Sequence, residues 1–134
     1  MNQFAIITPA PDIIETFVQH SILKKIIERK VIQLKIINLR DYGLGKHKQI
    51  DDTPFGGGGG MIFKPEPLYD AIDASFSWMA SKDNIRVIYP APGGEEWNQN
   101  SAEKLSVNNN IILICGHYKG IDERVIDEYV TDQY

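Results

Sequence analysis

Five consecutive glycines, residues 56–60, form the stretch of this sequence best suited to hold a ligand. A backbone without Cβ atoms adopts positive φ freely and lets a flat molecule approach its peptide groups closely. Glycine runs are more often flexible linkers. Linkers are polar on both sides, however, whereas Phe55 and Met61 flank this run and Pro54 stiffens its approach. The sequence therefore favours an ordered ligand loop over a linker.

Charged side chains gather just before the glycines. Lys46, His47 and Lys48 are followed by Asp51 and Asp52. The cations could hold phosphate oxygens of a nucleic acid, and the carboxylates could accept hydrogen bonds from the edge of a base. A surface loop that neutralises its own charge explains the same residues equally well, and both interpretations stay open at this point.

Two apolar strand-like segments end in turn residues. Residues 85–89 run into Pro90-Ala91-Pro92-Gly93-Gly94, and residues 111–115 run into a second turn at 116–120 that begins and ends with glycine. In open parallel sheets, ligands bind beyond the carboxyl ends of the strands. Free backbone amides and carbonyls in such turns suit a planar polar ligand. One turn alone would be an ordinary crossover, but both turns together with the glycine run predict a pocket.

Several other kinds of site are excluded by spacing. The glycine run is followed by methionine where a dinucleotide fingerprint requires glycine, and no Gly-Lys-Ser/Thr ends a phosphate loop. His20, His47 and His117 are not spaced as metal ligands, so no metal site is expected. Cys115 is the single cysteine, which rules out an internal disulfide, and its apolar neighbours indicate a buried structural thiol.

The composition bounds the class of protein. A chain of 134 residues with 43% hydrophobic and 24% charged residues is sized for one domain with one core. A net charge of −4 argues against a surface that is basic throughout, so any RNA contact must be local. No run of 18 apolar residues and no basic leader is visible, and we therefore expect a cytoplasmic protein without a membrane span.

Strand-like and helix-like segments alternate along the chain, which indicates an α/β fold with a parallel sheet flanked by helices. Asp12 is expected to cap a helix that continues through Ile27, and Asn98 to cap a later one. Residues 111–115 are apolar on both faces and are placed in the middle of the sheet. The expected strands are 4–8, 31–39, 85–89, 111–115 and a last one around 129–131, and the expected helices are 12–27, 65–79 and 98–107.

Several motifs in one order and spacing resemble the bacterial tRNA (guanine-N1)-methyltransferase family, TrmD, over essentially the whole chain. They are Asn38-Leu39-Arg40-Asp41-Tyr42, Lys46-His47-Lys48, Asp51-Asp52, Pro54-Phe55 with the five glycines and Met61, Lys64-Pro65-Glu66-Pro67, and Cys115-Gly116-His117-Tyr118-Lys119-Gly120-Ile121-Asp122-Glu123-Arg124-Val125.

The resemblance implies an S-adenosylmethionine-dependent methyltransferase of the SPOUT class, whose parallel sheet carries a trefoil knot. It further implies a homodimer that methylates N1 of the guanosine 3′ of the anticodon in tRNA; a need for magnesium stays open. The implied cofactor-binding residues are Tyr89, Pro90, Ala91, Pro92, Gly94, Gly116, Tyr118 and Gly120, and the implied contacts to the guanine and the tRNA are Asp51, Gly56, Gly60, His47 and Lys48.

Two positions depart from the family pattern. The first turn reads Pro-Ala-Pro-Gly-Gly where the family commonly shows Leu-Ser-Pro-Gln-Gly, so backbone contacts carry over but those of the serine and glutamine side chains do not. Lys119 stands where many members have glutamate, and a carboxylate role there does not carry over either.

In the family the sequence continues past the position of Tyr134, through a segment that completes the pocket and the knot, into a tRNA-binding domain. Guanine N1 carries a proton at neutral pH, so its methylation needs a base, and the resemblance places that base beyond Tyr134. We therefore expect residues 1–134 to be the amino-terminal S-adenosylmethionine-binding domain, with an incomplete knot, weak cofactor binding and no activity alone. A non-catalytic RNA-binding or dimerisation module and an unrelated small-nucleotide enzyme are the alternatives.

Overall fold

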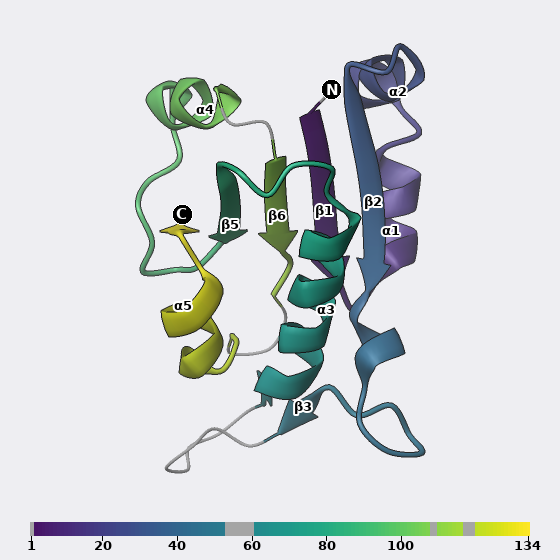
Figure 1. Ribbon diagram of the computed structural model, residues 1–134, viewed down its shortest axis with the longest axis vertical. Coiled ribbons are helices and arrows are strands. Elements are labelled where there is room, and N and C mark those ends of the chain that lie inside the picture. Colours follow the sequence, from purple (N-terminus) through teal and green to yellow (C-terminus); the bar gives the residue numbers. More distant parts are fainter. Residues whose placement is uncertain (1, 53–60, 108–109, 117–119) are drawn as a thin grey trace.

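A five-stranded parallel sheet forms the centre of the computed structural model, which describes residues 2–52, 61–107, 110–116 and 120–134 (Figure 1). The strand order is β2-β1-β6-β5-β7, and each neighbouring pair is parallel. The predicted α/β class is thereby confirmed. The strands are β1 (Asn2–Thr8), β2 (Ile32–Asn38), β5 (Ile85–Tyr89), β6 (Asn110–Ile114) and β7 (Asp132–Gln133).

The apolar run of β6 places this strand at the sheet centre, as predicted, between β1 and β5. Ile112 and Ile114 are fully buried, and Ile7 of β1 lies opposite Ile114 in the register. β2 keeps the alternation expected of a half-exposed strand, with Gln33 and Lys35 exposed and β1 as its neighbour on one side.

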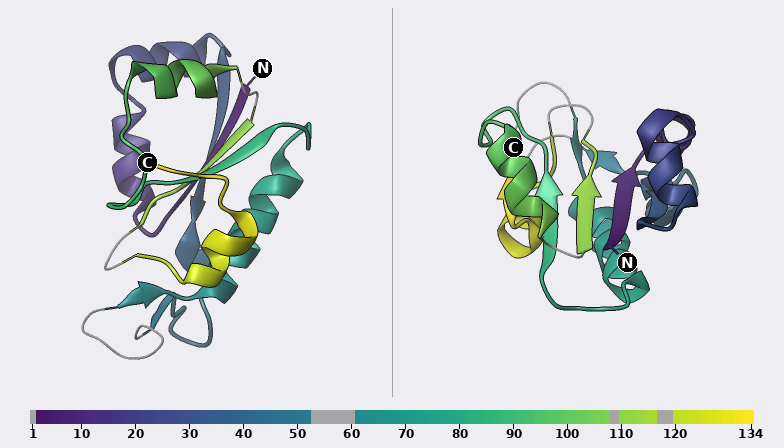
Figure 2. Two further views of the ribbon diagram at one scale, coloured as in Figure 1. Left: turned by 90° about the vertical axis from the view of Figure 1, so that its left-hand side faces the viewer. Right: turned by 90° about the horizontal axis from the view of Figure 1, so that it is seen from above.

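Helices α3 (Pro65–Trp78) and α5 (Glu123–Tyr129) cover one face of the sheet, and α1 (Pro11–Phe17), α2 (Ser21–Glu28) and α4 (Gln99–Ser106) lie on the other (Figure 2). The main core forms beneath α3, because Leu68, Ala71 and Ile72 recur at helical spacing and are fully buried. α4 begins as predicted: the Asn98 side chain accepts a hydrogen bond from the Ser101 backbone N–H at 3.1 Å.

The helix predicted from Asp12 to Ile27 is two helices. Ser21 has a φ of 54°, which a continuing right-handed helix does not allow, and the Val18 N–H closes α1 by donating to the Ile14 carbonyl. α1 also begins one residue earlier, at Pro11, so Asp12 lies in the first turn and is not the cap.

The strand predicted around 129–131 is also wrong, because α5 runs through Tyr129 and β7 begins only at Asp132. Asp122 caps α5 by accepting from the Arg124 N–H at 2.9 Å, and Val125 then turns into the core. Helix capping and burial against α3 outweigh the strand propensity of the Tyr-Val-Thr stretch. In the described part of the chain, no helix has the length and apolarity needed to cross a membrane.

Candidate active site

The strand ends from which the two predicted ligand turns begin lie side by side, because the two strands are neighbours and parallel. β5 ends at Tyr89 and β6 at Ile114, and these strands pair directly. The Tyr89 ring is where the turns meet. A Cβ added at Gly116 would lie 3.2 Å from Cε1 of Tyr89, and one added at Gly120 would lie 3.0 Å from its hydroxyl oxygen. Gly116 and Gly120 both lie close to the Tyr89 ring, and an added Cβ at either position would press on it.

Gly120 joins the second turn to a short antiparallel ribbon that sequence reasoning did not foresee. The ribbon consists of β3 (Asp51–Asp52) and β4 (Ile62–Phe63), the two segments that flank the glycine run. The backbone N–H of Phe63 donates to the Gly120 carbonyl at 3.0 Å, and the N–H of Asp122 donates to the Phe63 carbonyl at 3.2 Å. The approach to the glycine run is thereby fixed beside the second predicted cofactor turn.

Asp51, a predicted guanine contact, is part of this ribbon. Asp51 is partly buried and lies opposite Phe63, whose side chain is fully buried. Its neighbour Asp52 lies opposite Ile62 and is within 3.9 Å of the Lys64 ammonium. Gly56 and Gly60, the other predicted guanine contacts, lie outside the described residues, as does Tyr118 of the second turn.

The first turn is anchored to β7. The Ala91 N–H donates to the Tyr134 carbonyl at 2.7 Å, and the Gly94 N–H donates to the Ala91 carbonyl at 3.0 Å. Pro90 and Pro92 have no N–H to offer. Contrary to the expectation of free amides, most of the amides of this turn are thus absent or already bonded. Such a turn suits a ligand with hydrogen-bond donors, such as an amino group on a flat ring, better than an anion.

Two titratable side chains, Tyr89 and Cys115, lie at the ends of the two strands that precede the turns. Burial raises the pKa of the Tyr89 phenol, although the backbone N–H of Ile121 acts in the opposite direction. Cys115, which the sequence predicts to be buried, is only partly buried, and this burial raises the pKa of its thiol. Its backbone N–H donates to the Ile7 carbonyl at 2.8 Å. At neutral pH these two side chains therefore contribute no charge to the site, which suits a neutral or cationic ligand.

An ion pair borders the site where α5 begins. Nε and one Nη of Arg124 donate to the two carboxylate oxygens of Asp122 at 2.9 and 2.8 Å. The guanidinium holds the pKa of Asp122 below its ordinary value. Sequence reasoning missed this pair and the role of Phe63; an aspartate directly before a helix-like Glu-Arg-Val-Ile run was the available signal for the cap.

His47 and Lys48 lie on an exposed turn at the same end of the molecule, in the loop between residues 42 and 51 (Figure 1). Leu44 and Gln49 close this turn through two backbone hydrogen bonds of 2.8 and 2.9 Å. Gly43 permits the closure, because a Cβ there would lie 2.3 Å from the Lys48 carbonyl carbon. The two side chains are thus exposed to solvent, where a large partner could reach them. No cluster of three potential metal ligands occurs among the residues that the structure describes.

Comparison with known proteins identifies the family of the chain. Residues 2–134 match the family model described as tRNA (Guanine-1)-methyltransferase TrmD. The chain belongs to this family. The resemblance seen in the sequence is thereby confirmed over the whole chain.

Individual TrmD proteins agree with this assignment. The tRNA (guanine-N(1)-)-methyltransferase of Clostridioides difficile is 43% identical over 134 residues, which are 98% of this chain and 56% of the relative. That of Caldanaerobacter subterraneus is 44% identical over 91% of this chain and 49% of the relative. The crystal structure of tRNA (m1G37) methyltransferase from Aquifex aeolicus matches with a TM-score of 0.84 and 34% identity, over 98% of this chain and 58% of that one. The chain spans about half the length of the curated relatives that it matches.

Proposed function

We propose that residues 1–134 form the cofactor-binding part of an S-adenosylmethionine-dependent methyltransferase acting on N1 of the guanosine 3′ of the anticodon. One observation carries the proposal beyond family membership. The Phe63–Gly120 hydrogen bond of 3.0 Å holds the approach to the glycine run against the turn that follows β6. A methyl donor at the turns and a purine at the glycine run would therefore be neighbours, which methyl transfer between them requires.

The cofactor would be held by Tyr89, Pro90, Ala91, Pro92 and Gly94 of the first turn and by Gly116, Tyr118 and Gly120 of the second. S-adenosylmethionine supplies a methyl group on a positively charged sulfur that leaves as a neutral thioether. The first turn fits this ligand, because its spare polar groups are mainly carbonyls that can accept from the adenine amine. Tyr89 and Cys115 are uncharged at neutral pH and therefore place no charge beside the sulfonium.

The guanine would lie along the glycine run between Gly56 and Gly60, with the Asp51 carboxylate accepting from its N–H groups. His47 and Lys48, on their exposed turn, would contact the RNA backbone. The proton on N1 must pass to a base, and by family analogy that base lies in the polypeptide by which the relatives exceed this chain. We extend the proposal to a homodimer, to a cytoplasmic location and, as an open point, to a supporting magnesium ion.

Two measurements test the proposal. In calorimetric titrations, S-adenosylmethionine and S-adenosylhomocysteine should bind this chain weakly and ATP should not bind. In assays on unmodified tRNA, the chain alone should transfer no measurable methyl group, and a fusion carrying the remainder of the Clostridioides difficile relative after residue 134 should methylate. A tRNA with adenosine in place of the target guanosine is the matched control.

Three results would count against it. Equal binding of ATP and S-adenosylhomocysteine would favour a small-nucleotide enzyme. RNA binding that persists without any cofactor affinity would favour a non-catalytic module. Methylation of the adenosine control would place the reaction on another base.

A further inference from the structure

Lys48 has a backbone conformation that lysine rarely adopts. Its φ is 54°, in the left-handed region, where the Cβ atom of an L-residue is crowded by the following carbonyl oxygen. It lies in the exposed turn that the bridge between Leu44 and Gln49 closes. Glycine and asparagine are the residues best suited to positive φ, and this chain has them at Gly45 and Asn84. The lysine at position 48 is therefore held in a strained conformation.

The surrounding backbone fixes this conformation. The Lys48 N–H donates to the Gly45 carbonyl at 3.3 Å. Its carbonyl group packs so closely on Gly43 that a Cβ added there would lie 2.3 Å from both the carbon and the oxygen. The two hydrogen bonds between Leu44 and Gln49 hold the ends of the turn together. The backbone of the turn therefore sets the direction in which the Lys48 side chain leaves it.

Strain at an exposed residue calls for a reason other than packing, and such residues concentrate at sites that hold ligands. An ion pair within the protein is not the reason, because none of the ion pairs among the residues that the structure describes involves Lys48. Lys30 also has a positive φ, of 58°, but it follows α2, where a cation is favourable at the helix carboxyl end. That explanation does not apply to Lys48, which lies in a turn.

We propose that the turn around Lys48 is a preformed phosphate site, in which the left-handed backbone directs the ammonium at one phosphate of the RNA. The inference rests on the proposed function and assigns to one lysine a contact that composition would divide among neighbours. A lysine side chain loses conformational freedom when it binds, and a backbone that already sets its direction reduces this loss. Lys46 lies in the same turn without a positive φ and would add only general attraction for RNA.

Glycine substitutions measure the strain. Lys48→Gly should raise the melting temperature of the 134-residue chain by about 1–4 °C, because glycine adopts positive φ without the Cβ clash. Lys30→Gly should raise it similarly, since its φ is also positive. Lys46→Gly relieves no strain and should not raise it. Lys48→Gln removes the charge but keeps a Cβ and a long side chain, so it should not raise the melting temperature either.

The same variants, made in the fusion with the remainder of the Clostridioides difficile relative, measure the phosphate contact. Binding of a stem-loop RNA that carries the target guanosine is followed by fluorescence anisotropy over a range of salt concentrations. Lys48→Gly and Lys48→Gln should each weaken binding about fivefold and lower the salt slope by about one phosphate contact. Lys46→Gly should weaken binding about twofold or less. Lys30→Gly should change neither quantity, because α2 lies at the opposite end of the molecule from the turn (Figure 1).

A variant that is more stable and yet binds RNA more weakly cannot be explained by damage to the fold. A melting temperature that Lys48→Gly leaves unchanged or lowers would overturn the strain. Equal losses of affinity in Lys48→Gly and Lys46→Gly, or no loss in either Lys48 variant, would overturn the phosphate site. RNA binding that depends on Lys48 without any methyl transfer by the fusion would support the phosphate site and count against the proposed reaction, so the two proposals can fail separately.

Discussion

Replacing Gly120 with alanine tests the link between the second turn and the ribbon. Gly120 has a φ of +136°, a conformation that L-residues rarely adopt, and strain of this kind costs about 1–3 kcal/mol. The new Cβ would also lie 3.0 Å from the Tyr89 hydroxyl oxygen, which has to move by a few tenths of an ångström. Together we expect a loss of about 2–4 kcal/mol in the free energy of unfolding.

Matched variants separate the two contributions to this loss of stability, which are the backbone strain and the crowding against Tyr89. Gly45 has a φ of +72° with nothing within 4 Å of an added Cβ, so Gly45→Ala carries backbone strain alone, about 1–2 kcal/mol. Tyr89→Phe removes the hydroxyl that the new Cβ meets. Adding Tyr89→Phe to Gly120→Ala should therefore recover the crowding part and leave the strain.

Urea unfolding gives the free energies, and hydrogen exchange gives the local consequence. The Phe63 amide donates to the Gly120 carbonyl at 3.0 Å, so its exchange should speed up in Gly120→Ala more than that of amides in β1. If Gly120→Ala destabilises no more than Gly45→Ala, and Phe63 exchange does not change, the Tyr89–Gly120–Phe63 contact does not have the role assigned here.

Further predictions concern three other contacts. Arg86 forms a bidentate ion pair of 2.7 Å with Asp132 and holds the pKa of this carboxylate below its ordinary value. The ion pair therefore stabilises the fold at pH values above the pKa of Asp132 in the unfolded chain, and this stabilisation is lost as the pH falls below about 4. Asp132→Asn should cost about 1–2 kcal/mol at pH 7 and less at pH 3, and an equal loss at both would contradict this. Phe63→Ala should cost about 3–5 kcal/mol in urea unfolding, against about 0.5 kcal/mol or less for the exposed Val107→Ala. Cys115 is partly buried, which raises the pKa of its thiol, so a thiol reagent at pH 7.5 should modify it more slowly in the native than in the unfolded chain; equal rates would contradict this.

Local sequence patterns predicted most strands and the family but missed contacts between distant segments. The apolar run of β6 and the Asn98 cap are decided by neighbouring residues and were found. The break before Ser21 and the ribbon at Phe63 depend on a positive φ and on a hydrogen bond to Gly120, 57 residues away, which no local pattern encodes. The strand predicted at 129–131 failed partly for this reason, because Tyr129 packs against the distant Tyr69 in addition to the local cap at Asp122.

The candidate site shows the same division. Gly116 and Gly120 were recognisable because glycine at a strand end signals a close approach, and the structure identifies its object as Tyr89. The expectation of free amides in the first turn was wrong. Two residues of the turn are prolines without an N–H, and the N–H groups of two others are bonded within the protein. A turn that is rich in glycine and proline thus indicates where a ligand could bind, but which polar groups remain for it depends on the tertiary contacts of the turn.

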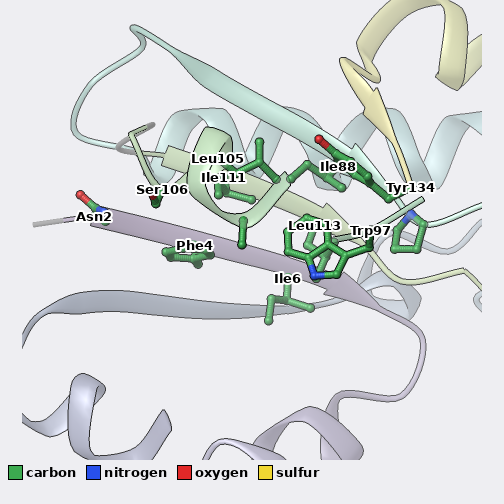
Figure 3. A pocket seen from close by; sticks show the side chains of 12 residues that line it. Asn2, Phe4, Ile6, Ile88, Trp97, Leu105, Ser106, Ile111, Leu113 and Tyr134 are labelled. Carbon is green, nitrogen blue, oxygen red and sulfur yellow. The ribbon is translucent and has the colours of Figure 1, made fainter. Parts of the chain in front are cut away.

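The two faces of strand β6 are buried to different extents. Its sequence is apolar on both faces, which predicts burial on both, yet burial is complete only where Ile112 and Ile114 meet the α3 layer. Leu113, which points the other way, lines an apolar groove of about 550 Å³ and is partly exposed (Figure 3). Fully burying a leucine side chain contributes about 1.5–3 kcal/mol, and Phe4 and Ile6 lie partly exposed beside it. The apolar sequence of β6 therefore predicts its central place in the sheet correctly but overestimates the burial of the face on which Leu113 lies.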